Sequence, residues 1–352
     1  MITAFSEQPA LTEDEFLKRE YGIRIQYDCQ IVDLLRENAA NLIIIVSPNP
    51  SFWYPVLKSK PDKTVIFFLV GNETYDPVVF NALNGLPSLA HVFIYNLPTK
   101  IRVNQKVFAL FGDLIDSMPI KRLSDFSACL RDFKTSFHLK KKFYACRLDY
   151  KHSRLPQGYS NAFVHGLIDL GVIPHDNNDS LVSNTKIRNT NIGLDKIKRV
   201  IFVGQKTNRR RKNVVAYFSQ FEENIIISKA TGFGGTTYDG DTSYTRLLFE
   251  SWFNLIPPGF FNNSNHRYTE SCIAGSIPLI LSHNSIDHSE NYNWTNSLGN
   301  LTGHSMRLID REIESFSSKK LRDLQSEIRE KDFAQIMGSV SVFKRLIEQF
   351  TL

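Results

Sequence analysis

The chain has 352 residues, which is long for a single hydrophobic core and suits two domains. Its composition, 42% hydrophobic and 22% charged, excludes a disordered chain, and no apolar run approaches the ~20 residues that span a bilayer. The net charge of +6 is compatible with nucleic acid, an anionic membrane surface or an anionic small substrate, and alone it selects none of them.

The N-terminal stretch MITAFSEQPALTEDEF lacks a basic region followed by an apolar run, so we expect no signal peptide and a cytoplasmic protein. The four cysteines have no metal-ligand spacing, and free buried thiols are expected. The sequence therefore predicts neither a disulfide framework nor a cysteine-based metal site.

In the first half of the chain, short apolar runs alternate with mixed segments. Strands are expected at residues 41–47, 64–71, 91–96 and 106–112, and helices at residues 29–37, 78–83 and 159–170. Because these runs are apolar throughout rather than at every second residue, the strands should be covered on both faces, as in a parallel α/β sheet. The stretch 173–192 is rich in Asn, Asp, Ser and Thr and is interpreted as a linker.

A second alternation of strands and helices follows the linker. Strands are expected at residues 199–204, 224–229, 253–256 and 277–282, and helices at residues 210–221, 244–252, 266–274 and 317–352, the last with a break near Gly338. This rhythm is typical of a doubly wound sheet. We predict an α/β acceptor-binding domain at 1–190, an α/β nucleotide-sugar domain at 191–335, and a helix at 336–352 that packs back on the first domain.

The segment 251–282 carries the most chemical information. A Pro-Pro-Gly turn at 257–259 ends an apolar strand, an Asn-rich loop follows, and a helix is expected to begin near residue 266. A helix N-terminus favours anions, and Arg267 adds a forked cation suited to phosphate. Glu270 is three residues further on, on the same helix face, where a carboxylate can accept both hydroxyls of a ribose. The alternative is a solvated surface pair.

This segment resembles the donor-site signature of the exostosin-like glycosyltransferases. Their pattern is a strand ending in Pro-Pro-Gly, a Ser/Asn-rich loop, Arg-x-x-Glu, and Gly-Cys-Ile-Pro before the next strand. This chain has the turn at 257–259, the pair Arg267 and Glu270, and Gly-Ser-Ile-Pro at 275–278, with Ser276 in place of the usual Cys. The likeness covers residues 200–335, while the N-terminal half resembles the family only in its α/β pattern.

The resemblance implies an α/β fold of GT-B type, in which two Rossmann-like doubly wound domains face a cleft. It implies a transferase that uses a nucleotide-diphosphate sugar, usually UDP-linked, with inversion at the anomeric carbon and no required metal or cofactor. Arg267 would hold the diphosphate and Glu270 the ribose. The residues expected to contact the donor are Arg267, Glu270, Pro258, Gly259, Asn265, Tyr268, Gly204, Arg210, Arg211 and Tyr244.

The basic run at 209–212 follows an expected strand and opens an expected helix. Its arginines could hold the donor phosphates from the other side, or form a solvated helix start or an RNA-binding patch. The spacing is not that of a P-loop, and the neighbours are Asn and Val rather than aromatic residues, so no nucleic-acid partner is expected. Asp239 and Asp241 have the spacing of a metal-binding DxD motif, but a loop and helix cap is favoured, without metal.

Inversion requires a base, because the acceptor hydroxyl loses its proton as it attacks. The base should come from the N-terminal domain, and each candidate could equally be an exposed loop acid or a core histidine. The sequence does not choose among the candidates, which are Glu73, Asp76, Asp149 and His152.

These features together favour an enzyme that builds a bacterial surface polysaccharide, such as a capsule or O-antigen. The acceptor would be a growing glycan, free or lipid-linked, and the basic surface would aid peripheral contact with the inner face of the membrane. Two other classes stay open. One is a nucleotide-sugar-binding subunit without activity, and the other is a nucleic-acid-binding protein that uses residues 209–212.

Overall fold

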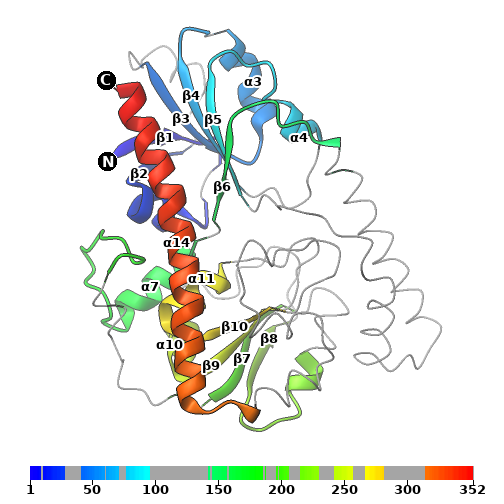
Figure 1. The fold of residues 1–352 in the computed structure, drawn as a ribbon, viewed down its shortest axis with the longest axis vertical. Coiled ribbons are helices and arrows are strands. Elements are labelled where there is room, and N and C mark those ends of the chain that lie inside the picture. The colour runs from blue at the N-terminus through cyan, green and yellow to red at the C-terminus, as the bar shows by residue number, and fades with distance from the viewer. Residues whose placement is uncertain are drawn as a thin grey trace, which may run out of the picture.

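The computed structural model shows two β-sheets, each built of parallel strands. One sheet lies above the other in Figure 1, and a long C-terminal helix runs along both. This is the predicted α/β architecture and is consistent with the GT-B type. The residues that the structure describes are 1–8, 11–27, 41–59, 61–70, 77–95, 145–156, 158–184, 198–205, 215–229, 242–256, 266–280 and 314–351, with the single residues 142, 187 and 196.

The first sheet has the strand order β2-β1-β3-β4-β5-β6, and every pairing is parallel. After β2 the chain crosses to the other side of β1, so the direction of winding reverses between β1 and β3. The strands are β1 (Ile2–Phe5), β2 (Ile23–Gln26), β3 (Leu42–Ser47), β4 (Thr64–Leu69), β5 (Leu89–Tyr95) and β6 (His152–Leu155).

Alternate residues of β3 and β4 enter two different hydrophobic clusters. Ile44 and Phe68 belong to the larger core, whereas Ile45 and Phe67 belong to a second core on the opposite face. Burial on both faces therefore explains the continuous apolar runs, and the predicted strands at 41–47, 64–71 and 91–96 are confirmed. The predicted helix at 29–37 and strand at 106–112 lie outside the described residues.

Several helices of the first half agree with the prediction, and others were not expected. The predicted helices at 78–83 and 159–170 appear as α4 (Pro77–Asn81) and α7 (Asn161–Asp169). The short helix α1 (Asp14–Phe16), the π-helix η1 (Leu17–Tyr21) and α3 (Pro50–Lys58) were not predicted. The first two are only three and five residues long, which is too short for an apolar period to be recognised.

The second sheet has the order β10-β9-β7-β8, again with parallel pairings, and its winding reverses between β7 and β9. All four predicted strands are confirmed, and the predicted helix at 244–252 ends at Glu250, because Ser251 already pairs with Lys198. The helix that precedes the last strand ends at Gly275, which adopts the left-handed conformation with φ 71°. The elements are β7 (Lys198–Gln205), β8 (Ile225–Lys229), α10 (Thr242–Glu250), β9 (Ser251–Ile256), α11 (Arg267–Ala274) and β10 (Ile277–Ile280).

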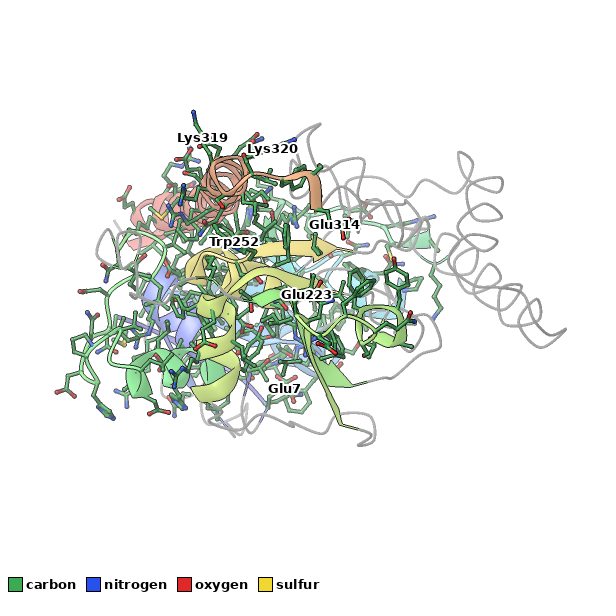
Figure 2. All side chains as sticks on the ribbon, turned by 90° about the horizontal axis from the view of Figure 1, so that it is seen from below. Glu7, Glu223, Trp252, Glu314, Lys319 and Lys320 are labelled. Carbon is green, nitrogen blue, oxygen red and sulfur yellow. The ribbon has the colours of Figure 1, made fainter. Side chains whose placement is uncertain are left out.

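Helix α14 (Ser318–Thr351) is continuous through Gly338, so the predicted break at that residue is wrong. The packing around the glycine outweighs its low helix propensity, since Ile336 and Phe343 are buried and the ring of Phe343 meets that of Phe68 edge-on. Figure 2 shows Lys319 and Lys320 on the outer side of the first turn. In the described parts of the chain, no helix is long and apolar enough to cross a membrane.

Substitution of Gly338 by alanine is expected to raise the free energy of unfolding by about 0.5 to 1 kcal/mol. Gly338 is exposed, and an added Cβ would meet no atom within 4 Å. Urea unfolding followed by circular dichroism measures the change. A loss of stability would mean that the helix is interrupted at this residue after all.

The segment that connects the two sheets packs against the rest of the protein at several points. Residues 173–184 form neither helix nor strand, as expected for the linker, yet Leu181 and Val182 are buried. Helix α7 packs so closely on α10 that a Cβ on Gly166 would lie 2.1 Å from Thr245 Oγ1. Thus α7, which precedes the linker, covers an element of the second half. Of the four cysteines, the structure describes two: Cys272 is a buried free thiol, and the Sγ of Cys146 donates a hydrogen bond to the backbone oxygen of Lys142.

Candidate functional site

Arg267 lies at the point where the second sheet reverses its winding. Its guanidinium group is above the ring of Phe202, with Cζ 5.8 Å from the ring centroid, and against Gly204 near the carboxyl end of β7. A Cβ on Gly204 would lie 2.7 Å from Nη2 of Arg267, so the glycine makes room for the guanidinium group. Open parallel sheets bind ligands outside the carboxyl ends of their strands at such a reversal. The predicted diphosphate-binding arginine therefore occupies the edge where a ligand is expected.

Glu270 is one turn further along α11 and is almost completely buried, with 2% of its surface exposed. Its Oε1 accepts hydrogen bonds from the backbone N (3.0 Å) and Oγ (2.6 Å) of Ser160, the N-cap residue of α7. Its Oε2 accepts a hydrogen bond of 2.9 Å from Tyr244 Oη. Burial, and then the charge of Glu270, raise the pKa of Tyr244 well above its usual value, so this phenol stays a donor.

These contacts contradict the alternative of a solvated surface pair at Arg267 and Glu270. The ribose-binding role of Glu270 stays a prediction. Both carboxylate oxygens already accept hydrogen bonds, so a ribose would use the remaining lone pair of Oε2 or replace one of the present donors.

The other predicted donor residues are placed unevenly. Gly204 and Tyr244 lie beside Arg267 and Glu270, as described, while Tyr268 is 1% exposed and belongs to the larger hydrophobic core. The other predicted donor residues lie outside the described residues, and these are Pro258, Gly259, Asn265, Arg210 and Arg211. The acids Asp239 and Asp241 also lie outside them.

Of the four predicted bases, the structure describes Asp149 and His152, and neither of these two lies beside Arg267. Glu73 and Asp76 lie outside the described residues. Asp149 and His152 are exposed, and His152 is the first residue of β6, paired with Val92. Because β5 and β6 are parallel, His152 lies level with the middle of β5, and Asp149 precedes it toward the amino end of the sheet. Both are therefore set back from the carboxyl end of β5, where Tyr95 contacts His266. The sequence could not indicate this, since β6 has only four residues and was not predicted.

Three residues that were not predicted meet near Arg267. His266 Nε2 lies 3.3 Å from Glu13 Oε1, and its Nδ1 lies 3.4 Å from Tyr95 Oη. Burial alone would raise the pKa of Glu13, but the hydrogen bond and charge of His266 outweigh it and lower that pKa. The signal that could have found Glu13 is its place in the loop after β1, a strand too short to be recognised.

At the reversal point of the first sheet, a second carboxylate follows β1. Glu7 accepts hydrogen bonds from Ser47 Oγ, at the end of β3, and from Trp53 Nε1 at 2.8 Å. Within the described ranges, no three His, Cys, Asp or Glu side chains gather as a metal site.

Comparisons with known proteins identify no family for this chain. No family model matches it, and no curated protein matches it in sequence, so the exostosin-like resemblance rests on the residues alone. Among solved structures, the N-terminal domain of Candida albicans trehalose-6-phosphate phosphatase is similar over 92% of this chain and 73% of that one, with 10% identity and a TM-score of 0.48. An α1,3-fucosyltransferase is similar over 98% of this chain and 89% of that one, with 11% identity and a TM-score of 0.39. With TM-scores below 0.5, neither likeness carries a function.

Proposed function

We propose that the chain is a glycosyltransferase that moves a sugar from a nucleotide-diphosphate donor to a hydroxyl group of a glycan. The observation that carries this proposal is the position of Arg267 at the reversal point of the second sheet, with Glu270 one turn further along α11 and hydrogen-bonded to Tyr244 of α10. A planar guanidinium group can hold a diphosphate through paired hydrogen bonds, and the N-terminus of α11 adds N–H donors to the same anion.

In this proposal Arg267 stabilises the charge that develops on the diphosphate as the glycosidic bond breaks. The pair formed by Glu270 and Tyr244 offers an acceptor and a phenol for the ribose hydroxyls. The exostosin-like signature supports a UDP-linked donor, inversion of configuration and no required metal. The bacterial polysaccharide role, the lipid-linked glycan acceptor and contact with the inner face of a membrane belong to the same proposal.

A turnover screen tests the proposal. Purified protein is incubated with UDP-, GDP- and CMP-sugars and a set of glycan acceptors, and the released nucleotide is measured. We expect release from a diphosphate donor, loss of turnover in Arg267→Ala, and normal turnover in Arg246→Ala, whose exposed side chain pairs with Glu250 on the surface of α10. Nucleotide binding without turnover would favour the non-catalytic subunit.

The contact between Gly204 and Arg267 gives a finer prediction. In Gly204→Ala the new methyl group would lie 2.7 Å from Nη2, so the guanidinium group must move, whereas the backbone has no such clash. We expect nucleotide affinity to fall about 10-fold, the equivalent of about 1.4 kcal/mol, with little change in the melting temperature. Isothermal titration calorimetry measures the affinity, with Gly338→Ala as the control. Unchanged affinity would place the diphosphate away from Arg267.

A further inference from the structure

Three polar side chains from distant parts of the chain meet where the two sheets adjoin. Glu13 lies in the loop after β1, Tyr95 is the last residue of β5, and His266 immediately precedes α11. His266 is 3.3 Å from Glu13 and 3.4 Å from Tyr95, and Tyr95 Oη also lies 3.4 Å from Glu13 Oε1. The first sheet therefore supplies a carboxylate and a phenol to an imidazole of the second half.

Glu13 and His266 differ in exposure, and this difference assigns them different roles. The side chain of Glu13 is 11% exposed and that of His266 is 24% exposed, so the carboxylate is more deeply buried than the imidazole ring. Hydrogen bonding to His266 keeps Glu13 ionised despite its burial, as the lowered pKa indicates. An anionic partner on Nε2 fixes the N–H at that nitrogen and leaves Nδ1 as the basic atom, which faces the Tyr95 hydroxyl.

His266 is also the residue next to Arg267. A donor whose diphosphate is held by Arg267 brings its anomeric carbon to the same end of α11, because that carbon is bonded directly to a phosphate oxygen. His266 is therefore adjacent in the chain to the expected diphosphate-binding residue, and it contacts Glu13 and Tyr95 of the first half. Glu7 differs, because within the described residues its hydrogen-bond donors are Ser47 and Trp53, which both belong to the first half.

We propose that His266 removes the proton of the acceptor hydroxyl and that Glu13 is the positioning residue behind it; this inference rests on the proposed function. The acceptor oxygen forms a bond to the anomeric carbon while the bond from that carbon to the phosphate oxygen breaks. The diphosphate leaves with the bonding electrons and is held by Arg267. The proton passes to Nδ1 of His266, whose positive charge is stabilised by Glu13. The proposal requires the acceptor hydroxyl to approach Nδ1 on the side where the Tyr95 hydroxyl lies, 3.4 Å from that nitrogen.

The test separates donor binding from turnover. The nucleotide dissociation constant and kcat are measured for the wild-type protein, His266→Gln, Glu13→Gln and Glu13→Asp, and for Glu7→Gln as the comparison carboxylate. Thermal unfolding confirms that each variant is folded. We expect kcat to fall about 100-fold or more in His266→Gln and Glu13→Gln, with nucleotide affinity nearly unchanged. Glu13→Asp should recover part of the loss, and Glu7→Gln should lose much less.

The results that would overturn the role of His266 differ from those that would overturn the proposed transferase function. An active wild type whose His266→Gln variant keeps its kcat, or loses nucleotide affinity as much as turnover, would overturn the proton-transfer role and leave the transferase function intact. A larger loss of kcat in Glu7→Gln than in Glu13→Gln would also overturn it. A wild type with no turnover of any donor would overturn both proposals, and a folded Tyr95→Phe variant with normal kcat would agree with the role given to His266.

Discussion

Replacement of Glu20 by alanine is expected to lower the free energy of unfolding by about 3 to 5 kcal/mol. Glu20 is 6% exposed, and its carboxylate accepts hydrogen bonds from four donors. These are Tyr159 Oη (2.7 Å), Ser180 Oγ (2.6 Å) and the backbone N of Leu181 (2.9 Å) and Val182 (3.3 Å). The substitution would leave these buried donors without their acceptor, and removing a buried acceptor costs far more than an average hydrogen bond contributes.

Urea unfolding of Glu20→Ala and of Glu348→Ala measures this effect against a matched control. Glu348 is exposed on α14, so its replacement should change stability by less than about 0.5 kcal/mol. Glu20→Gln should be intermediate, because it keeps the shape but has only one acceptor oxygen. A loss below about 1 kcal/mol in Glu20→Ala would mean that Glu20 does not hold the linker to η1.

Asp332→Asn is expected to stabilise the protein above about pH 4, with a gain that grows until about pH 7. Asp332 is 4% exposed on α14, and in the described structure its Oδ2 has no hydrogen-bond partner. Burial raises its pKa from 3.8 to about 7, against the opposing effects of a hydrogen bond from Thr269 and the charge of Arg154. The folded chain therefore holds this proton more tightly than the unfolded chain does.

The sign of the pH dependence follows from the raised pKa. Below about pH 4 the carboxyl group is protonated in both the folded and the unfolded state. As the pH rises from about 4 to 7, the unfolded state releases its proton while the folded state retains it, so the free energy of unfolding falls over this range. Each pKa unit corresponds to about 1.4 kcal/mol, so Asp332→Asn should gain about 2 to 4 kcal/mol at pH 8 and almost nothing at pH 4.

Unfolding curves of wild type and Asp332→Asn at pH 4.5, 6 and 8 measure this difference. The two proteins are compared at each pH, because the titration of His91 changes the free energy of unfolding with pH in the opposite direction. Burial, and then His152 and Lys151, lower the pKa of His91 from 6.5 to about 4, so this residue destabilises the fold as the pH falls. That contribution is common to both proteins and cancels. A variant that is less stable than wild type at pH 8 would show that Asp332 is needed as an anion beside Arg154.

The strands that could be predicted with least ambiguity are those whose own sequence of apolar residues shows that both faces are buried. Strands β3, β4 and β5 are apolar on both faces because both faces are buried, and the sequence shows it. Strands β1, β2 and β6 have only four residues each and include polar side chains such as Arg24 and His152, so their strand form depends on their partners in the sheet.

In the candidate site, too, some residues could be predicted from the sequence and others could not. Arg267 and Glu270 could be recognised because a turn, a helix start and two charges are consecutive in the sequence. The hydrogen bonds from Ser160 to Glu270 join residues 110 positions apart, and the contact between Glu13 and His266 joins the two halves of the chain. Such pairings depend on the packing of α7, α11 and the loop after β1, which no local pattern reports. The Gly338 prediction failed for a related reason, since packing overrode propensity.

The most direct test of the donor site is calorimetric titration of UDP, GDP and CMP into wild type, Arg267→Ala and Arg246→Ala, without added metal. We expect micromolar binding of UDP to the wild type, an affinity at least about 100-fold weaker in Arg267→Ala, and no change in Arg246→Ala. Failure of all three nucleotides to bind the wild type, or equal affinity in Arg267→Ala, would contradict the assignment of a nucleotide-diphosphate site to this edge of the second sheet.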